Sequence, residues 1–210
     1  MQYFDNNENL DSKLRILKYK YQDVNFNFYS DLGVFSKDRI DYGSILLVET
    51  YLKYHSEPVD VLDVGCGYGF IGCVICKING GNVDMVDVNN RALHLSKMNQ
   101  KENDIANLNI FNSNIYDNVT KKYDAVITNP PIRAGKSVYL TIINAAFNHL
   151  NVDGELWFVM RNNHGVKTVI KDLSKKYNTS VLKKDIIVEI IPLFNEVKKA
   201  EPKILKPFIR

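Results

Sequence analysis

Residues 59–69 read Val-Asp-Val-Leu-Asp-Val-Gly-Cys-Gly-Tyr-Gly, and this stretch decides the fold. Its first six residues are mainly apolar and β-branched, which predicts a short buried strand. The glycines at 65, 67 and 69 predict a sharp turn whose backbone approaches a ligand where a Cβ would collide. Helical spacing resumes over residues 69–78. The stretch is therefore a strand that runs into a glycine-rich loop opening a helix.

The same alternation of strand and helix continues to residue 192. Apolar runs predict strands at 59–64, 82–87, 107–112, 123–128, 154–161, 180–184 and 186–192, and amphipathic spacing predicts helices at 69–78, 90–103, 137–150 and 164–177. Such alternation is typical of a mainly parallel sheet covered by helices on both faces. The last two strands leave no room for a helix and must pair antiparallel. We expect a Rossmann-like α/β fold with a seven-stranded sheet and an antiparallel last strand.

The chain before residue 59 has a different pattern. Period-two alternation at 17–21 and 24–28 predicts a β-hairpin, and residues 45–54 have helical spacing. The loop from Ser30 to Ser44 is expected to fold over a bound ligand as a lid. We divide the chain into a hairpin and lid segment (1–42), the α/β domain (43–194) and a charged tail (195–210).

Composition excludes several classes of protein. The chain has no apolar run near the ~18 residues of a membrane helix, and its start lacks a signal-peptide pattern. Its 3 cysteines have no framework spacing, which favours a reducing, cytoplasmic compartment. The net charge of +3 permits a nucleic-acid partner without demanding one. We expect one domain with an appendage, and a monomer is favoured.

The carboxylates around the glycine loop indicate the kind of ligand. The spacing G-x-G-x-G differs from the dinucleotide fingerprint G-x-G-x-x-G. Asp63 stands two residues before the first glycine, where it would repel a pyrophosphate and suit an ammonium or sulfonium group. Asp87 follows the loop by about twenty residues, where a carboxylate accepts hydrogen bonds from ribose hydroxyls. The alternative for Asp87 is a helix N-cap or a solvated strand end.

A third strand end supplies candidate contacts for the rest of the ligand. Asn114 follows the strand at 107–112 and is a candidate contact for an adenine edge, with Ile115 packing on the ring. Amine, ribose and adenine contacts at three consecutive strand ends predict S-adenosylmethionine as the cofactor. The expected cofactor-binding residues are Asp63, Gly65, Cys66, Gly67, Gly69, Asp87, Val88, Asn114, Ile115 and Asn129.

The fourth strand ends in Thr-Asn-Pro-Pro-Ile-Arg-Ala-Gly-Lys, residues 128–136. Each proline fixes φ, lacks an N–H and restricts the residue before it. Asn129 and Pro130 are therefore held extended, with hydrogen-bond acceptors at a strand end. The alternative is an ordinary loop, because Asn-Pro and Pro-Pro are common turn signals.

Three stretches resemble one methyltransferase family. Residues 33–38 (GVFSKD), 62–69 (LDVGCGYG) and 129–136 (NPPIRAGK) are similar to the bacterial small-subunit ribosomal RNA guanine-N2 methyltransferases (RsmC-like), in a short single-domain form. The resemblance covers roughly residues 14–192. It implies the class I methyltransferase fold and methyl transfer to the exocyclic amine of a guanine, with ribosomal RNA or the small ribosomal subunit as partner.

The resemblance also implies roles for residues at the end of the fourth strand. The Asn129 side-chain oxygen and the Pro130 carbonyl would accept the two amine hydrogens, with Pro131 keeping the loop rigid, so that the nitrogen lone pair becomes available. Related enzymes use Asp at this position, so Asn129→Asp is expected to keep partial activity. The sequence departs from the family pattern at Ile132, where an aromatic residue is common, and at Asn114, which is often acidic.

Substrate contacts are expected from the flanking segments. Arg133 and Lys136 are candidates to bind RNA phosphates, or else belong to a solvated loop. Phe35 in the lid would stack on a base or pack in the core. Cys73 and Cys76 have C-x-x-C spacing, but their helical position favours buried structural thiols over redox or metal chemistry, and no metal site is expected.

Other functions remain open from the sequence. The same chemistry would serve an adenine N6 amine or a protein glutamine, although Ile132 and the Arg-Ala-Gly-Lys continuation argue against both. The intact Asn129 counts against a non-catalytic donor-binding RNA or assembly module. A nicotinamide-binding protein is disfavoured by the glycine spacing and Asp63.

Overall fold

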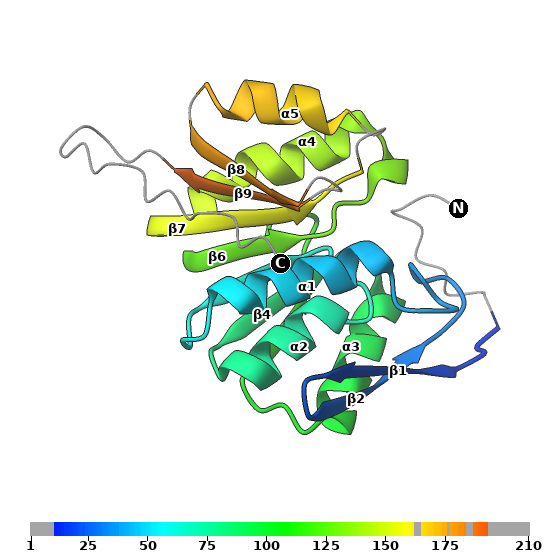
Figure 1. Ribbon diagram of the computed structural model, residues 1–210. Helices are drawn as coiled ribbons and strands as arrows, with labels where there is room; N and C mark the ends of the chain where they lie inside the picture. Colours follow the sequence, from blue (N-terminus) through cyan, green and yellow to red (C-terminus); the bar gives the residue numbers. More distant parts are fainter. Residues whose placement is uncertain (1–10, 162–164, 176, 184–186, 193–210) are drawn as a thin grey trace.

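A computed structural model describes residues 11–161, 165–175, 177–183 and 187–192. The expected tail at 195–210 lies outside these residues. In Figure 1 a central sheet lies between two sets of helices, and a two-stranded hairpin lies below the lower set. This is the predicted α/β architecture.

The sheet has seven strands in the order β5-β4-β3-β6-β7-β9-β8. β4, β5 and β6 extend the parallel sheet from β3, β7 is parallel to β6, and β9 is antiparallel to both β7 and β8. The antiparallel last strand is thus confirmed. The strand bounds are β3 Val61–Val64, β4 Val83–Asp87, β5 Leu108–Asn112, β6 Tyr123–Thr128, β7 Leu150–Val159, β8 Tyr177–Lys183 and β9 Ile187–Pro192.

Helices cover both faces of the sheet, as Figure 1 shows. α1 (Tyr42–Tyr54), α2 (Phe70–Asn79) and α3 (Asn90–Glu102) lie on one face, and α4 (Lys136–Ala145) and α5 (Val166–Leu173) on the other. Side chains alternate along each strand, so neighbours Val61 and Leu62 belong to two separate core clusters. The fully buried Trp157 is part of the first cluster.

The N-terminal hairpin forms a further layer over α2 and α3. β1 (Arg15–Tyr21) and β2 (Val24–Ser30) pair antiparallel through the expected two-residue connection at 22–23. Tyr19 and Phe28 each meet the Phe70 ring edge-on, at centroid distances of 5.0 and 5.3 Å. A lone hairpin is marginal in water, and this aromatic contact helps to fix its position on the domain.

Two helix ends differ most from the sequence expectation. The helix expected over 137–150 ends at Ala145, a short 3-10 turn (η2, Ala146–His149) follows, and β7 begins at Leu150 instead of residue 154. The strand pair β6–β7 has a register shift between Tyr123 and Ala125, which lets Leu150 pair with Tyr123 before the regular ladder starts. The helix expected over 164–177 ends at Leu173, and β8 takes Tyr177. Both boundaries were decided by strand pairing, which joins residues far apart in the sequence and so cannot be read from a local pattern.

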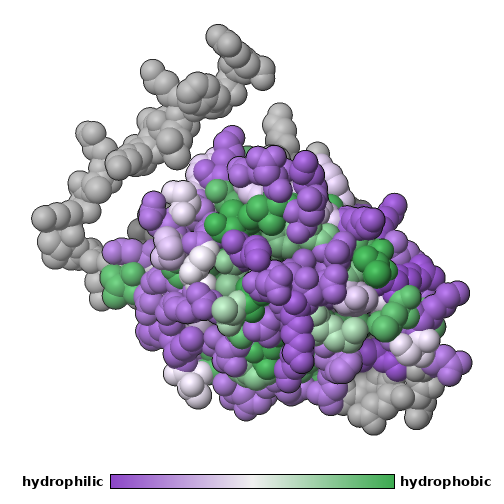
Figure 2. All heavy atoms as spheres, turned by 90° about the horizontal axis from the view of Figure 1, so that it is seen from below, coloured by the Kyte–Doolittle hydropathy of each residue, from purple (hydrophilic) through white to green (hydrophobic). Residues whose placement is uncertain are grey.

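The outer surface has an ordinary polar character. Figure 2 shows the molecule from the hairpin side, where a mainly hydrophilic surface surrounds separate, small hydrophobic areas. Within the described ranges, no helix combines the length and apolar character that crossing a membrane requires.

Candidate active site

The glycine loop lies where β3 ends and α2 begins. The backbone N–H groups of Gly65 and Cys66 both donate to the Val86 carbonyl, at 2.9 and 3.0 Å, which holds the loop against the end of β4. Gly67 has φ 58°, and a Cβ built on it would meet nothing within 4 Å. The loop thus presents backbone to open space in a conformation that favours glycine.

Asp63 lies beneath this loop and is fully buried. Its Oδ2 accepts from the Gly72 N–H at 3.0 Å, while its Oδ1 is buried and has no hydrogen-bond partner in the described structure. Burial raises the pKa of Asp63 to about 7, and the nearby Asp87 carboxylate adds to the rise. A buried carboxylate oxygen without a partner is costly unless a cation or donor meets it.

Asp87 joins the glycine loop to the start of α3. Its carboxylate accepts from the Gly67 N–H and the Asn89 N–H, both at 2.9 Å. Burial raises its pKa, and these backbone hydrogen bonds oppose the rise. A carboxylate has about four acceptor positions, and the Val88 N–H also interacts with this one, so acceptor capacity for about one further donor remains. The alternative as a simple helix N-cap does not hold, since Asn89 is the N-cap residue of α3.

The third strand end, after β5, is more exposed to solvent than the ends of β3 and β4. Asn114 is exposed and donates from Nδ2 to Asp117 Oδ2 at 3.1 Å, while Ile115 has φ 56° and packs partly against the second core cluster. A β-branched residue in the left-handed region is strained, and such strain is common at ligand sites. Val88 is half-buried beside it, and its carbonyl accepts from Asn112.

Asn129 is held by residues far away in the sequence. Its Nδ2 donates to Asp41 Oδ2 at 3.0 Å and to Ser44 Oγ at 2.8 Å. Both amide hydrogens are therefore used, and Oδ1 is left as the acceptor. Asp41 is also the N-cap of α1, where Oδ2 accepts from the Ser44 N–H at 2.9 Å.

Thr128 connects the segment that carries Asn129 to the strand that precedes the glycine loop. Its buried Oγ1 donates to the Val64 carbonyl at 2.8 Å. Val64 precedes Gly65 and Thr128 precedes Asn129 in the sequence, so one hydrogen bond links the two halves of the candidate site. The carboxyl ends of β3 and β6 are thereby held together.

The loop after Asn129 turns at once toward α4. Pro131 accepts from the Ala134 N–H at 2.9 Å, which closes a short 3-10 turn (η1, Ile132–Ala134). Ile132 is half-buried and packs against the second core cluster, while Arg133 and Lys136 are exposed. Lys136 is the first residue of α4 and so does not belong to an irregular loop.

The lid segment is anchored beside Asp87. Asn89 donates from Nδ2 to the Gly33 carbonyl at 3.2 Å, and Arg91 pairs with the buried Asp31 at 3.2 Å. Phe35 is 63% exposed, which excludes the alternative that it packs in the core. An exposed aromatic side chain on an anchored lid remains available to stack on a base.

Sequence reasoning did not single out Asp41, Ser44 or Thr128 as part of the site. Asp41 and Ser44 stand where an N-cap of α1 is expected, and that local pattern was the available signal. Their contact with Asn129 joins positions 85 and 88 residues apart and is visible in the folded chain alone.

The cysteine thiols are not placed for nucleophilic chemistry. Cys66, Cys73 and Cys76 are buried free thiols, and burial raises the pKa of each. A buried thiol with a raised pKa is unreactive. Among the residues that the structure describes, no group of three His, Cys, Asp or Glu side chains is arranged to hold a metal ion.

The residues present fit the predicted cofactor. The orphaned buried oxygen of Asp63 suits a cationic group, the open backbone at Gly67 admits a close ligand, and Asp87 retains acceptor capacity. The fold and this site define a class I S-adenosylmethionine-dependent methyltransferase.

Comparison with known proteins gives the family. A family model for the methyltransferase small domain matches residues 25–188, and the chain belongs to this family. It is 36% identical over 186 residues to the uncharacterized protein YbxB of Bacillus subtilis, which covers 87% of this chain and 92% of that protein. S-adenosylmethionine is accordingly its cofactor.

Two further relatives concern ribosomal RNA. The chain is 38% identical over 132 residues to ribosomal RNA small subunit methyltransferase C of Erwinia tasmaniensis, a match that covers 60% of this chain and 38% of that protein. A solved T. thermophilus 16S rRNA N2 guanine methyltransferase (RsmC), in complex with AdoMet and guanosine, superposes with a TM-score of 0.77 at 20% identity. That superposition covers 87% of this chain and 52% of the other. At this identity the superposition shows a shared fold.

Proposed function

We propose that this protein transfers a methyl group from S-adenosylmethionine to the exocyclic N2 amine of a guanine in small-subunit ribosomal RNA. The observation that carries the proposal is the Asn129 carboxamide, whose two hydrogens are engaged by Asp41 and Ser44. Its oxygen is thus a fixed acceptor beside the glycine loop. The similarity to ribosomal RNA small subunit methyltransferase C supports the choice of substrate.

Each part of the site has one task in this proposal. The bound cofactor supplies an electrophilic methyl group on a sulfonium. Asp63 and Asp87 hold the cofactor, with Gly65, Cys66, Gly67 and Gly69 as its backbone cradle and Val88, Asn114 and Ile115 around the adenine. The Asn129 Oδ1 and the Pro130 carbonyl accept the two hydrogens of the guanine amine, which frees the nitrogen lone pair for attack.

The surrounding residues would bind the RNA. Arg133 and Lys136 are exposed and lie shortly after residues 129–131, which form the acceptor loop. In this position they would bind RNA phosphates. Phe35 would stack on a base from the lid, and Ile132 would contact the target base edge-on from its half-buried position. Residues 1–42 would then act together as hairpin and lid over the domain that starts at residue 43.

The amine of adenine or of a protein glutamine remains the second candidate. The aromatic residue associated with those substrates is replaced by Ile132, which packs against the core. An isoleucine gives a stacked base no aromatic face. Because an aromatic residue is also common at this position in the guanine-N2 family, the continuation Arg-Ala-Gly-Lys at 133–136 is the stronger reason to favour guanine.

The test is methylation of small-subunit RNA taken from cells that lack the protein. Nucleosides are analysed by mass spectrometry after incubation with the cofactor and either wild type or Asn129→Ala. We expect N2-methylguanosine with wild type. We expect a kcat about 10²–10³-fold lower with Asn129→Ala, as for loss of one preorganised polar group, while the melting temperature and cofactor affinity are kept. N6-methyladenosine in place of N2-methylguanosine, or no methylated nucleoside, with wild type would refute the guanine assignment. Equal turnover of the two proteins would refute the role of Asn129.

A further inference from the structure

The contact between Asp41 and Asn129 has consequences for the orientation of the catalytic amide. A single oxygen, Asp41 Oδ2, accepts from the Asn129 Nδ2 at 3.0 Å and from the Ser44 N–H at 2.9 Å. Ser44 is buried, and its Oγ accepts the second Asn129 hydrogen at 2.8 Å. Asn129 thus has two acceptors on one side.

These acceptors decide which way the carboxamide faces. An ionised carboxylate accepts hydrogen bonds and donates none, so the edge of Asn129 that faces Asp41 must be the NH₂ group. Rotation of the amide by 180° would bring its oxygen against the carboxylate and present two donors to the substrate amine, which is itself a donor. The rotated form is therefore unproductive.

We propose that Asp41, assisted by Ser44, is a positioning residue that fixes the Asn129 carboxamide with its oxygen toward the substrate amine. The proposal rests on the function proposed above. Asp41 acts through Asn129 and is not assigned a contact with either reactant.

The same segment also reaches the cofactor half of the site. The lid residue Gly33 accepts from Asn89 at 3.2 Å, and the Asn89 N–H donates to Asp87 at 2.9 Å. Asp41 lies near the end of the same lid segment. One stretch of chain, residues 33–44, is thus linked to both the cofactor-binding carboxylate and the amide acceptor.

A change of partner tests the positioning directly. Asn129→Asp places two carboxylates about 3 Å apart, so one must protonate or turn away, and we expect kcat to fall at least about 100-fold. In the double variant Asp41→Ser with Asn129→Asp, the opposing carboxylate is removed and the Ser44 hydroxyl can donate to the new carboxylate, which keeps an oxygen for the substrate. Serine also serves as an N-cap, so α1 keeps its start. We expect the double variant to recover at least about tenfold in kcat over Asn129→Asp.

A second pair of variants needs no methyl transfer. Asp41→Ser keeps an N-cap residue but is too short to reach Asn129, and combined with Ser44→Ala it removes both acceptors. We expect the Asn129 side-chain NH₂ signals in ¹⁵N-resolved NMR to shift and exchange faster with solvent. With Ser44→Ala alone, Asp41 still holds one hydrogen and the change should be smaller.

The outcomes separate this inference from the proposed function. Absence of guanine methylation by wild type refutes the function, and the NMR comparison still tests the contact. If wild type methylates guanine and the double variant Asp41→Ser with Asn129→Asp is no better than Asn129→Asp at matched folded fraction, the positioning role is overturned. Unchanged Asn129 amide signals in the variant lacking both acceptors also overturn it. A recovered kcat with unchanged cofactor affinity supports it.

Discussion

At the scale of the residue, Asn129 shows how a distant neighbour changes the meaning of a substitution. Its sequence context indicates that Asp is tolerated, because a carboxylate also offers an acceptor oxygen. In the folded chain the amide faces the carboxylate of Asp41 at 3.0 Å, which makes Asn129→Asp a pairing of like charges. The expected activity of this variant is therefore much lower than the motif alone indicates.

Asp63 gives a prediction about pH. Its pKa in the folded chain is about 7, raised from an ordinary value of 3.8 mainly by burial. A raised carboxyl pKa means that the folded state binds the proton more tightly than the unfolded state, so the contribution is fully present below about pH 4 and is lost as pH rises through 7. At about 1.4 kcal/mol per pH unit, the cofactor-free protein should lose up to roughly 4 kcal/mol of stability over this interval.

Asp63→Asn should make this loss smaller, since the amide carries no charge and still accepts from the Gly72 N–H. Urea unfolding of both proteins at pH 5 and pH 8 measures the difference, and the shared histidines cancel in the comparison. Cofactor affinity of the variant should fall by about 1.5–3 kcal/mol in calorimetry, as for loss of a hydrogen bond to a charged group. An identical pH dependence of the two proteins would show that Asp63 does not ionise in this range.

At the scale of the element, two asparagines attach the hairpin to α3. Asn99 accepts from the Tyr29 N–H at 2.6 Å and donates to the Tyr29 carbonyl at 3.0 Å. One turn further along, Asn103 accepts from the Asn27 N–H at 3.1 Å and donates to the Asn27 carbonyl at 2.9 Å. The two carboxamides replace a neighbouring strand and satisfy the free edge of β2, which would otherwise be a site for unwanted pairing.

Asn99 has a further bond, from Nδ2 to the Tyr68 carbonyl in the glycine loop at 2.8 Å. Asn99→Ala leaves several buried backbone groups without partners, and we expect it to lower the free energy of unfolding by about 2–4 kcal/mol. Faster hydrogen exchange at the Tyr29 amide should accompany this destabilisation. Lys97→Ala, at an exposed position of the same helix, is the control and should change stability by less than about 0.5 kcal/mol. Equal stability of the two variants would mean that the hairpin is held by its aromatic contacts alone.

At the scale of the whole molecule, charge is separated between the interior of the site and its rim. Asp63 and Asp87 are buried carboxylates that suit a cationic cofactor, whereas Arg133 and Lys136 are exposed cations beside the acceptor loop. A small basic excess, +3 over the whole chain, is thus less informative than the place of each charge. An acidic interior and a basic rim fit a cationic cofactor and a polyanionic substrate.

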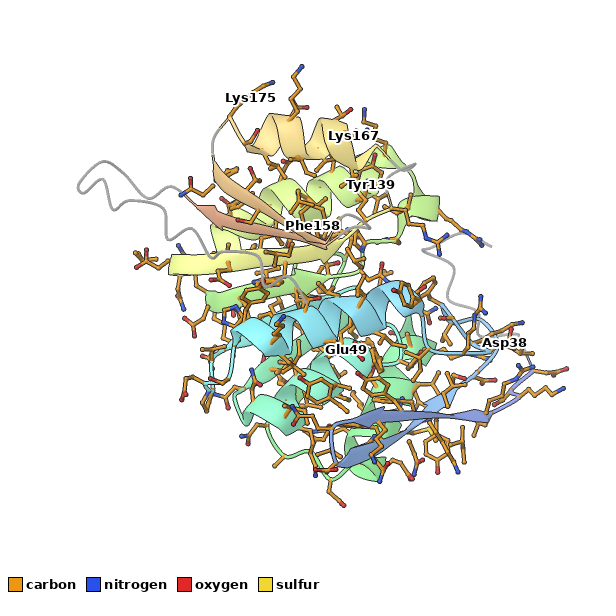
Figure 3. The ribbon with its side chains drawn as sticks, in the orientation of Figure 1. Asp38, Glu49, Tyr139, Phe158, Lys167 and Lys175 are labelled. Carbon is orange, nitrogen blue, oxygen red and sulfur yellow. The ribbon has the colours of Figure 1, made fainter. Side chains whose placement is uncertain are left out.

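The RNA role of the rim predicts a change in salt dependence. For the double variant Arg133→Ala with Lys136→Ala, the slope of log K for RNA against log salt should flatten by about 0.7–0.9 for each phosphate that is no longer neutralised. Cofactor affinity should not change. Lys53→Ala with Lys97→Ala is the matched control, because it also removes two exposed charges, from α1 and α3 on the other face of the sheet from α4. In Figure 3, Glu49 marks α1 and Tyr139 marks α4. If the rim variant and the control have the same slope, Arg133 and Lys136 do not contact RNA phosphates and are solvated surface residues.

The sequence by itself determined the fold class and the order of its parts. Strands and helices are local periodicities of two and 3.6 residues, and the glycine loop is a local need for left-handed backbone, so both can be read from consecutive residues. The antiparallel last strand followed from the absence of room for a helix, which is also a local fact. For the same reason the strand ends that carry Asp63, Asp87 and Asn129 were located before their contacts were known.

The tertiary structure alone decided how these strand ends work together. The start of β7 depends on a register shift against β6, the exposure of Phe35 depends on how the lid is anchored, and the edge of β2 depends on Asn99 of α3. Asp41 joins the site through a hydrogen bond to a residue 88 positions away. Side-chain hydrogen bonds act over about 3 Å in space whatever the separation in sequence, so no local pattern contains them. The sequence therefore located Asn129, and its hydrogen bonds to Asp41 and Ser44 at the start of α1 set the direction of its carboxamide.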